Sequence, residues 1–272
     1  MNRQAKGDLL KMRSEVNDEQ VNYFLDLKDN SILINDLIGK EIALKHTGVI
    51  HCIKCGKVTK KSFAQGFCYN CMQTAPEADE CVLRPNLCKA HLGVARDMDY
   101  AKEHCLKPHF VYLSNTGDVK VGVTRQSQIP TRWIDQGATS AVKICQTPNR
   151  HMAGLIEIHL GQHFTDKTHW RRMVSGQIDS TINMTEHREK AISLLNPEML
   201  PFICEDDRVY QFNYPIQKYP QIPKSLNFDS QPEIKGVLTG IKGQYIMLNN
   251  ELVFNIRRHN GYEVELMWES VD

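Results

Sequence analysis

Two pairs of closely spaced cysteines constrain this chain more than any other feature of its sequence. Cys52 and Cys55 form one CxxC pair, and Cys68 and Cys71 form a second pair after twelve intervening residues. Two short loops that each present two thiolates can close a tetrahedral Zn²⁺ site with no open position, so this zinc is predicted to stabilise the fold. A redox pair or two disulfides are the alternatives, but one CxxC suffices for redox chemistry and nothing indicates a secreted chain.

A second group of candidate metal ligands follows within 25 residues of sequence. It contains Cys81, Cys88, His91, His104 and Cys105, in the irregular spacing C-x6-C-x2-H followed by H-C. Three cysteines and a histidine in so short a stretch favour a second zinc over buried free thiols beside solvated histidines. The predicted ligands are Cys81, Cys88, His91 and Cys105, with His104 able to replace either of the last two. The chain is therefore expected to hold one to two structural zinc ions.

The charge of the chain is distributed unevenly. The net charge is only +1, but the stretch from Arg84 to Arg172 carries thirteen Lys and Arg against seven Asp and Glu, and seven of the eleven histidines. A basic middle with acidic ends suits a surface that binds a polyanion such as DNA or RNA, and scattered solvated charges are the alternative. No run approaches the roughly 18 apolar residues of a membrane span, and the N-terminus lacks the apolar core of a secretory signal. We therefore expect a cytoplasmic protein that binds no membrane.

The stretch from residue 109 to 137 organises the middle of the chain. Residues 110 to 113 are apolar and β-prone, and residues 119 to 124 alternate apolar with polar side chains after a turn of Asn-Thr-Gly-Asp. Pro130 suits the first turn of a helix that stops at Gly137. The pattern predicts a hairpin followed by a helix.

Four polar side chains of this stretch can converge at one end of the predicted hairpin and helix. They are Tyr112, Lys120, Arg125 and Arg132. Three cations beside a phenol predict a phosphate-binding site. Glu157 lies further along, beside the apolar stripe of a helix predicted over residues 148 to 164, where composition alone favours an ordinary exposed carboxylate.

The order of these patterns predicts an α+β protein with four consecutive segments. They are a β-rich N-terminal segment (1–50), a zinc-binding region (51–107), an α/β core with helices (108–200), and an extended wrap with a small C-terminal β-domain (201–272). The segments GKEIAL near residue 40 and GYEVEL near residue 262 resemble each other. This repetition suggests that the two ends of the chain pair in one β-domain.

Several blocks of the sequence resemble known families. Over almost its whole length the chain is similar to an uncharacterised prokaryotic family known only as a domain of unknown function. Residues 108 to 175 also resemble a GIY-YIG-type module, through Tyr112, the KVGVT segment and Arg132. The blocks that carry the first resemblance are QGFCYNC, PHFVYLSNTGDVKVGVTR, RWIDQGA, AGLIEIHL, DKTHW and GVLTGIKGQYI.

The GIY-YIG resemblance implies a role for individual residues. Tyr112 matches the tyrosine of the first motif, Lys120 stands where the tyrosine of the second motif belongs, and Gly122 matches the glycine of that motif. Arg132 matches the arginine that binds the phosphate, and Glu157 matches the glutamate that holds one divalent ion, Mg²⁺ or Mn²⁺. The sequence departs from the pattern at Lys120 and in the shorter spacing between the two motifs.

These features support three hypotheses for function. The first is a zinc-stabilised nucleic-acid-binding protein with a divergent GIY-YIG-like phosphate site, in which the nucleic acid contacts Gly122, Arg125, Trp133, Lys167 and Trp170. The second is a Mg²⁺-dependent GIY-YIG-type endonuclease or phosphodiesterase. The third is a non-enzymatic scaffold for protein interactions that uses the C-terminal β-domain.

Overall fold

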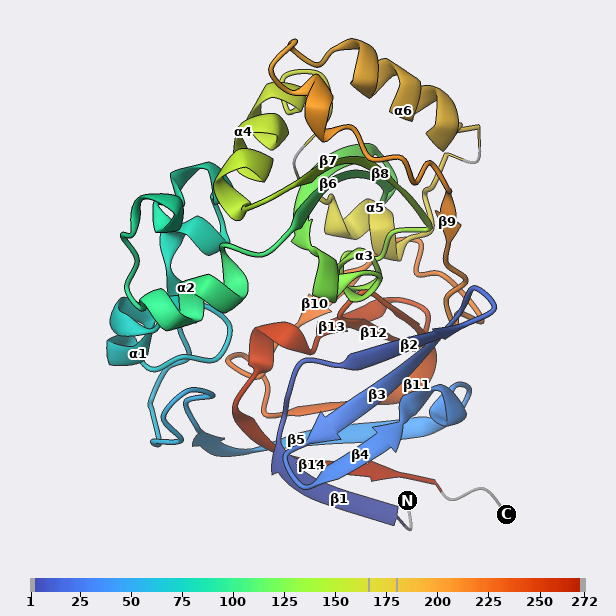
Figure 1. The fold of residues 1–272 in the computed structure, drawn as a ribbon. Helices are drawn as coiled ribbons and strands as arrows, with labels where there is room; N and C mark the ends of the chain where they lie inside the picture. Colours follow the sequence, from blue (N-terminus) through green and yellow to red (C-terminus); the bar gives the residue numbers. More distant parts are fainter. Residues whose placement is uncertain (1–2, 166, 180, 270–272) are drawn as a thin grey trace. The chain divides into compact units, whose positions relative to one another are not determined.

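The structure is a computed structural model that describes residues 3–165, 167–179 and 181–269. The chain divides into two compact units, whose helices and strands are labelled in Figure 1. Unit 1 holds the described parts of Met1–Gln73, Val174–Gly176 and Asn213–Asp272, and unit 2 holds those of Thr74–Met173 and Gln177–Phe212. Both ends of the chain thus contribute to unit 1, and the middle of the chain forms most of unit 2.

The secondary structure mixes short helices with strands throughout the described residues. The strands are β1 (Arg3–Asp8), β2 (Arg13–Asn17), β3 (Gln20–Leu27), β4 (Asn30–Leu33), β5 (Glu41–Ile50), β6 (His109–Asn115), β7 (Val119–Arg125), β8 (Ser140–Thr147), β9 (Tyr210–Gln211), β10 (Lys224–Leu226), β11 (Glu233–Lys242), β12 (Tyr245–Leu248), β13 (Leu252–Asn255) and β14 (Tyr262–Trp268). The helices are α1 (Tyr69–Thr74), α2 (Met98–His104), α3 (Thr131–Asp135), α4 (Arg150–Leu160), α5 (Trp170–Val174) and α6 (Met184–Ser193).

A seven-stranded sheet forms the body of unit 1, in the order β1-β14-β5-β11-β12-β13-β10. β5 pairs antiparallel with β14 (Figure 1), and the GKEIAL and GYEVEL segments meet at their last residues, where Leu44 lies opposite Leu266. Ile42 and Leu44 of β5 and Val264 and Leu266 of β14 are completely buried. The expectation that the two ends pair in one β-unit is confirmed.

A second sheet of unit 1 has the order β2-β3-β4. Its central strand alternates buried with partly exposed side chains, because a strand points successive side chains to opposite faces. Val21, Tyr23, Leu25 and Leu27 fill the buried face. This is the alternation expected from the sequence.

Unit 2 is built on a four-stranded sheet with the order β7-β6-β8-β9. β6 is one of its two interior strands, and all seven of its residues are buried. On one face, Val111, Leu113 and Val121 pack with apolar side chains of α4 and α6. The opposite face carries Tyr112, whose ring contacts Trp133 of α3. The predicted hairpin and the helices near residues 131 and 150 are confirmed, with slightly different ends.

The fold is therefore mixed α+β, with three β-sheets and a four-cysteine cluster in the N-terminal part of the chain. The two units group segments by contact, whereas the predicted division into four consecutive segments follows the order of the chain and stays a prediction. The sequence makes Asp166 a candidate N-cap for a helix that begins near residue 170, but Asp166 lies outside the described residues. In the described part of the chain, no helix combines the length and the apolar character that crossing a membrane requires.

Candidate functional site

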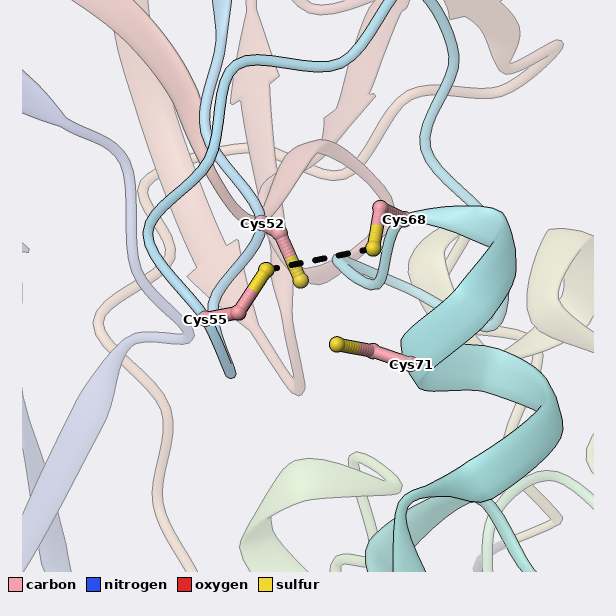
Figure 2. A group of neighbouring side chains, drawn as sticks. All are labelled: Cys52, Cys55, Cys68 and Cys71. Carbon is pink, nitrogen blue, oxygen red and sulfur yellow. Dashed lines mark hydrogen bonds between the residues drawn. The ribbon is translucent and has the colours of Figure 1, made fainter.

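The four cysteines of the two CxxC pairs form one cluster, referred to below as the four-cysteine cluster. Cys52 and Cys55 lie on the loop after β5, and Cys68 and Cys71 lie at the start of α1, with all four sulfurs turned toward one another (Figure 2). The Sγ atoms lie within 4.8 Å of one another, and those of Cys55 and Cys68 are 3.9 Å apart. Two thiolates bound tetrahedrally to one zinc at about 2.3 Å each lie about 3.8 Å apart, so the separation of Cys55 and Cys68 fits a single metal ion.

Within the four-cysteine cluster, the backbone favours the thiolate form of Cys52, whereas burial and the neighbouring thiols raise the pKa of Cys71 to about 12. Burial raises the pKa of the Cys52 thiol, but hydrogen bonds from the backbone amides of Cys55, Cys68 and Lys54 outweigh burial and lower the pKa to about 6. The loop is closed by backbone hydrogen bonds from Cys52 N to Lys57 O (2.9 Å) and from Gly56 N to Cys52 O (2.8 Å). The four sulfurs are therefore arranged to hold a metal ion such as zinc.

Three further cysteines form a second cluster, referred to below as the three-cysteine cluster. Cys81, Cys88 and Cys105 place their sulfurs within 4.8 Å of one another. Cys81 lies on a short 3₁₀ helix (Glu80–Val82), and Cys105 ends α2. The thiols of Cys105 and Cys81 donate to Cys88 and lower its pKa to about 3, so Cys88 is held as a thiolate. This cluster too is positioned to hold a metal ion such as zinc.

The histidines predicted as ligands of the second zinc do not join the three-cysteine cluster. His91 is exposed, and its ring stacks on His151 with centroids 4.3 Å apart. His104 stacks on Tyr100 and places its Nδ1 2.9 Å from Tyr100 O. Of the residues that the structure describes, no fourth ligand atom lies within 4.8 Å of all three sulfurs. His91 lies on a one-turn helix that buries Ala90 instead, an orientation that the C-x2-H spacing does not determine.

Tyr112 and Gly122 face each other across the β6–β7 hairpin. A Cβ atom on residue 122 would lie 2.7 Å from the Tyr112 hydroxyl oxygen, closer than side chains pack. Glycine at this position therefore makes the space for the phenol ring. The Tyr112 hydroxyl donates to Gln136 Oε1 at 3.0 Å, and the ring meets Trp133 edge-on at 5.8 Å. Tyr112 is completely buried.

Arg132 and Glu157 both act on Tyr112. Burial raises the pKa of the Tyr112 phenol, the Arg132 guanidinium lowers it, and the Glu157 carboxylate raises it further. The three side chains, from β6, α3 and α4, therefore lie within electrostatic reach of one another. Because its pKa is raised, the phenol stays protonated at neutral pH and acts as a hydrogen-bond donor rather than a base.

Lys120 shares a sheet face with Tyr112 and Gly122, because it lies two residues from Gly122 on β7. Its side chain is 6% exposed, and its Nζ lies 3.4 Å from Thr168 Oγ1. Arg125 lies at the far end of β7, where burial and the Arg150 guanidinium lower its pKa. The structure thus groups Lys120 with Tyr112 and places Arg125 nearer the three-cysteine cluster.

The remaining predicted contact residues differ in accessibility. Trp133 is completely buried among Tyr112, Tyr210 and Phe212, so its ring has no free face for stacking on a base. Lys167 is exposed, and Trp170 is half-buried with the guanidinium of Arg171 4.5 Å from its ring centroid. Lys167 and Trp170 can meet a ligand directly, whereas Trp133 contributes by packing.

Glu157 lines a surface groove of about 530 Å³, referred to below as the Glu157 groove. One wall is α4, through Glu157 and Ile158, and the other wall is the segment between Cys81 and Cys88, through Arg84, Asn86 and Leu87. The groove therefore offers a carboxylate, an amide, a guanidinium and apolar side chains to a ligand.

One protein family matches this chain over most of its length. Residues 39–264 match a family described as Protein of unknown function (DUF2797). The chain belongs to the DUF2797 family. The match includes both cysteine clusters, the hairpin, and α4 with Glu157. No curated protein and no solved structure matches the chain.

Three residues that shape these sites in the DUF2797 chain were missed in the sequence. Gln136 accepts the hydrogen bond from Tyr112, Arg150 donates to Cys81, and Gly154 lets the segment before Cys88 approach α4. The glycine inside an otherwise apolar helix was the one available signal, because such a glycine often marks close backbone approach. Gln136 and Arg150 carry no local signal.

Proposed function

We propose that this DUF2797 protein binds nucleic acid through a divergent GIY-YIG-like phosphate site in unit 2. The observation that carries the proposal is the electrostatic coupling of Tyr112 with Arg132 and Glu157 around Gly122. These residues lie on β6, β7, α3 and α4, in the chain order that the resemblance implies. This arrangement supports the proposal.

Arg132 is the residue proposed to bind the phosphate. It is partly exposed, and its guanidinium can donate two parallel hydrogen bonds to a phosphate. Lys120 is mostly buried beside Thr168 and adds positive potential without facing solvent. A nucleic-acid strand held at Arg132 can place a nucleotide in the Glu157 groove, with Lys167 and Trp170 as additional contacts.

Cleavage of the bound strand is the second candidate function, and Glu157 favours it. Its carboxylate lines the groove together with the amide side chains of Asn86 and Gln162, and oxygen donors of this kind suit Mg²⁺ or Mn²⁺. Such an ion, when bound, would neutralise charge on a phosphate oxygen. The buried phenol of Tyr112 would orient a ligand through Arg132 and Gln136 rather than take a proton from water. Binding is therefore proposed as the main function.

The test is binding and cleavage of labelled single- and double-stranded DNA and RNA, with and without Mg²⁺ or Mn²⁺. Arg132→Gln is expected to weaken binding about 10- to 100-fold, the loss of a charged hydrogen bond worth about 1.5–3 kcal/mol, and to reduce the salt slope by about one. Arg208→Gln is the matched control, because Arg208 is an exposed arginine of the same unit paired with Asp206. Its binding should stay within about twofold of wild type.

Glu157→Gln separates the two candidate functions. It is expected to leave binding within about twofold, because a carboxylate does not attract a phosphate. Metal-dependent cleavage by the wild type that disappears in Glu157→Gln would establish the second candidate. Absence of salt-sensitive binding to every DNA and RNA would contradict the proposal and favour a scaffold for protein interactions.

A further inference from the structure

Arg150, the first residue of α4, is a buried cation beside the three-cysteine cluster. Its side chain is 8% exposed, its Nη1 donates to Cys81 Sγ at 3.4 Å, and its Nη2 donates to His104 O at 3.5 Å. Its backbone N–H donates to Cys105 O at 2.8 Å. Among the residues that the structure describes, no carboxylate pairs with Arg150. The Cys81 sulfur is thus the cluster ligand that this guanidinium contacts.

The metal-loaded cluster and Arg150 carry equal and opposite charges. Three thiolates on a divalent ion carry a net charge of minus one, and a guanidinium carries plus one at every physiological pH. A buried guanidinium without a counter-charge would cost several kcal/mol. The loaded three-cysteine cluster supplies this counter-charge, whereas four thiolates would leave a second negative charge to balance.

The first two turns of α4 also hold the segment between Cys81 and Cys88. The Nδ1 of His151 lies 2.8 Å from Asn86 O. At Gly154, an added Cβ atom would lie 2.1 Å from Asn86 N, so the backbone of this segment rests directly on the helix. Glu157 follows one turn later on α4, and Asn86 and Leu87 form the facing wall of its groove.

We propose that the three-cysteine cluster builds the Glu157 groove, with Arg150 as the positioning residue that joins the two. Metal binding fixes Cys81 and Cys88 at the two ends of the segment. Arg150 balances the loaded cluster and attaches it to α4, and Gly154 allows the segment to close on the helix. Metal loading of this cluster and formation of the groove are therefore coupled. This coupling does not depend on the proposed function. Only the identity of the ligand that binds in the groove rests on the proposed function.

The first test measures metal retention in full-length variants. The wild type is expected to hold two zinc ions per chain. Arg150→Met keeps the length of the side chain but removes the charge, and is expected to lose one zinc to a chelator at about 10- to 100-fold lower concentration, the usual effect of removing a partner that supports metal ligands. Arg150→Lys, which keeps the charge, should recover part of this loss. Arg188→Met is the matched control, because Arg188 of α6 donates to the carbonyls of Lys143 and Cys204 and should leave zinc retention within about twofold.

The second test measures amide hydrogen exchange without nucleic acid. In Arg150→Met depleted of one zinc, faster exchange is expected in residues 83–87 and in α4, with unchanged exchange in residues 52–71 around the four-cysteine cluster. Gly154→Ala tests the coupling from the helix side. Alanine favours a helix more than glycine does, so a loss of zinc retention in this variant reports the clash with Asn86.

Two results would overturn the inference. One is wild-type zinc retention in both Arg150→Met and Gly154→Ala. The other is unchanged exchange in residues 83–87 and α4 after the second zinc is removed. Because neither measurement uses nucleic acid, failure of the proposed function would leave both readouts intact.

Discussion

The four-cysteine cluster in unit 1 and the three-cysteine cluster in unit 2 differ in their surroundings. The first draws all its ligands from a stretch of twenty residues that includes the exposed side chains of Lys54, Lys57 and Lys60. The second buries Cys88 and Cys105, and meets a buried arginine, Arg150, from a helix that starts 45 residues after its last ligand, Cys105. A metal site that closes on its own loop stabilises that loop. A metal site that recruits a distant helix can also shape a binding surface.

The largest expected effects come from removing one ligand of each cluster. Cys55→Ser should lose one zinc and several kcal/mol of stability, because structural zinc contributes about 10–16 kcal/mol of binding free energy in zinc-finger peptides. It should leave amide exchange in α4 unchanged. Cys88→Ser should lose the other zinc and increase exchange in α4. Zinc analysis and amide exchange measure both effects. Equal increases of amide exchange in α4 in the two variants would contradict the proposed difference between the clusters.

A second change of several kcal/mol in the free energy of unfolding is expected at Lys242, a buried basic residue of unit 1 that contrasts with Arg150. Lys242 is completely buried near Tyr214 and Tyr219, and its amine has no hydrogen-bond partner among the described residues. Burial lowers its pKa from 10.5 to about 7. Lys242→Met should therefore raise the free energy of unfolding at neutral pH by a few kcal/mol, whereas Arg150→Met should lower it.

The pH dependence of Lys242 has a defined sign. Between about pH 7 and 10.5 the unfolded chain binds a proton that the folded chain lacks, so this residue makes stability rise with pH across that window. Lys242→Met should remove this rise, as urea denaturation at several pH values would show. Lys235→Met is the control, because Lys235 lies on the same strand and is exposed beside Glu41. A Lys242→Met variant less stable than wild type would contradict the account.

A smaller loss of stability is expected from a change in the β6–β7 hairpin, which is predicted to fold independently of both metal clusters. Gly122→Ala is expected to cost about 1–3 kcal/mol, because its Cβ atom overpacks against the Tyr112 ring. Both zinc ions should be retained, since the hairpin is held by packing rather than by metal. Urea denaturation and zinc analysis of the same sample measure the two quantities. Loss of a zinc ion in this variant would show that the hairpin and a cluster form together.

The smallest expected effect concerns the lysines beside the four-cysteine cluster. Lys57→Gln removes an exposed charge that water and salt already screen, so zinc retention should change by less than about twofold. The corresponding change at Arg150 is expected to be at least fivefold larger. Equal chelator sensitivity of Lys57→Gln and Arg150→Met would remove the distinction between the two sites.

The sequence predicts local geometry well and distant contacts poorly. The four-cysteine cluster follows from two short loops, and the hairpin and α4 follow from periodicity and turn residues. The partners of the three-cysteine cluster depend on which side chains of the one-turn helices face inward, and the sequence does not determine this. In the structure, His91 lies at the surface and stacks on His151. Arg150 reaches Cys81 through tertiary structure, and no spacing rule connects two residues so far apart.

The aromatic side chains show the same limit. Trp133 follows Arg132, and the sequence predicts that it contacts nucleic acid, yet it is completely buried against Tyr112. A helix as short as α3 has no clear apolar stripe, so the sequence does not indicate which of its side chains faces the sheet. The pairing of Gly122 with Tyr112 follows from the register of the hairpin, which its turn determines.

The measurement that tests the central claim most directly is the affinity of wild type and Arg150→Met for one labelled nucleic acid at one salt concentration. Both proteins should carry the zinc of the four-cysteine cluster, as zinc analysis and unchanged exchange in residues 52–71 would verify. The account predicts salt-sensitive binding by the wild type and at least tenfold weaker binding by Arg150→Met. In that variant, the segment between Cys81 and Cys88 is no longer held against α4, so one wall of the Glu157 groove is lost. Equal affinities of the two proteins would contradict it.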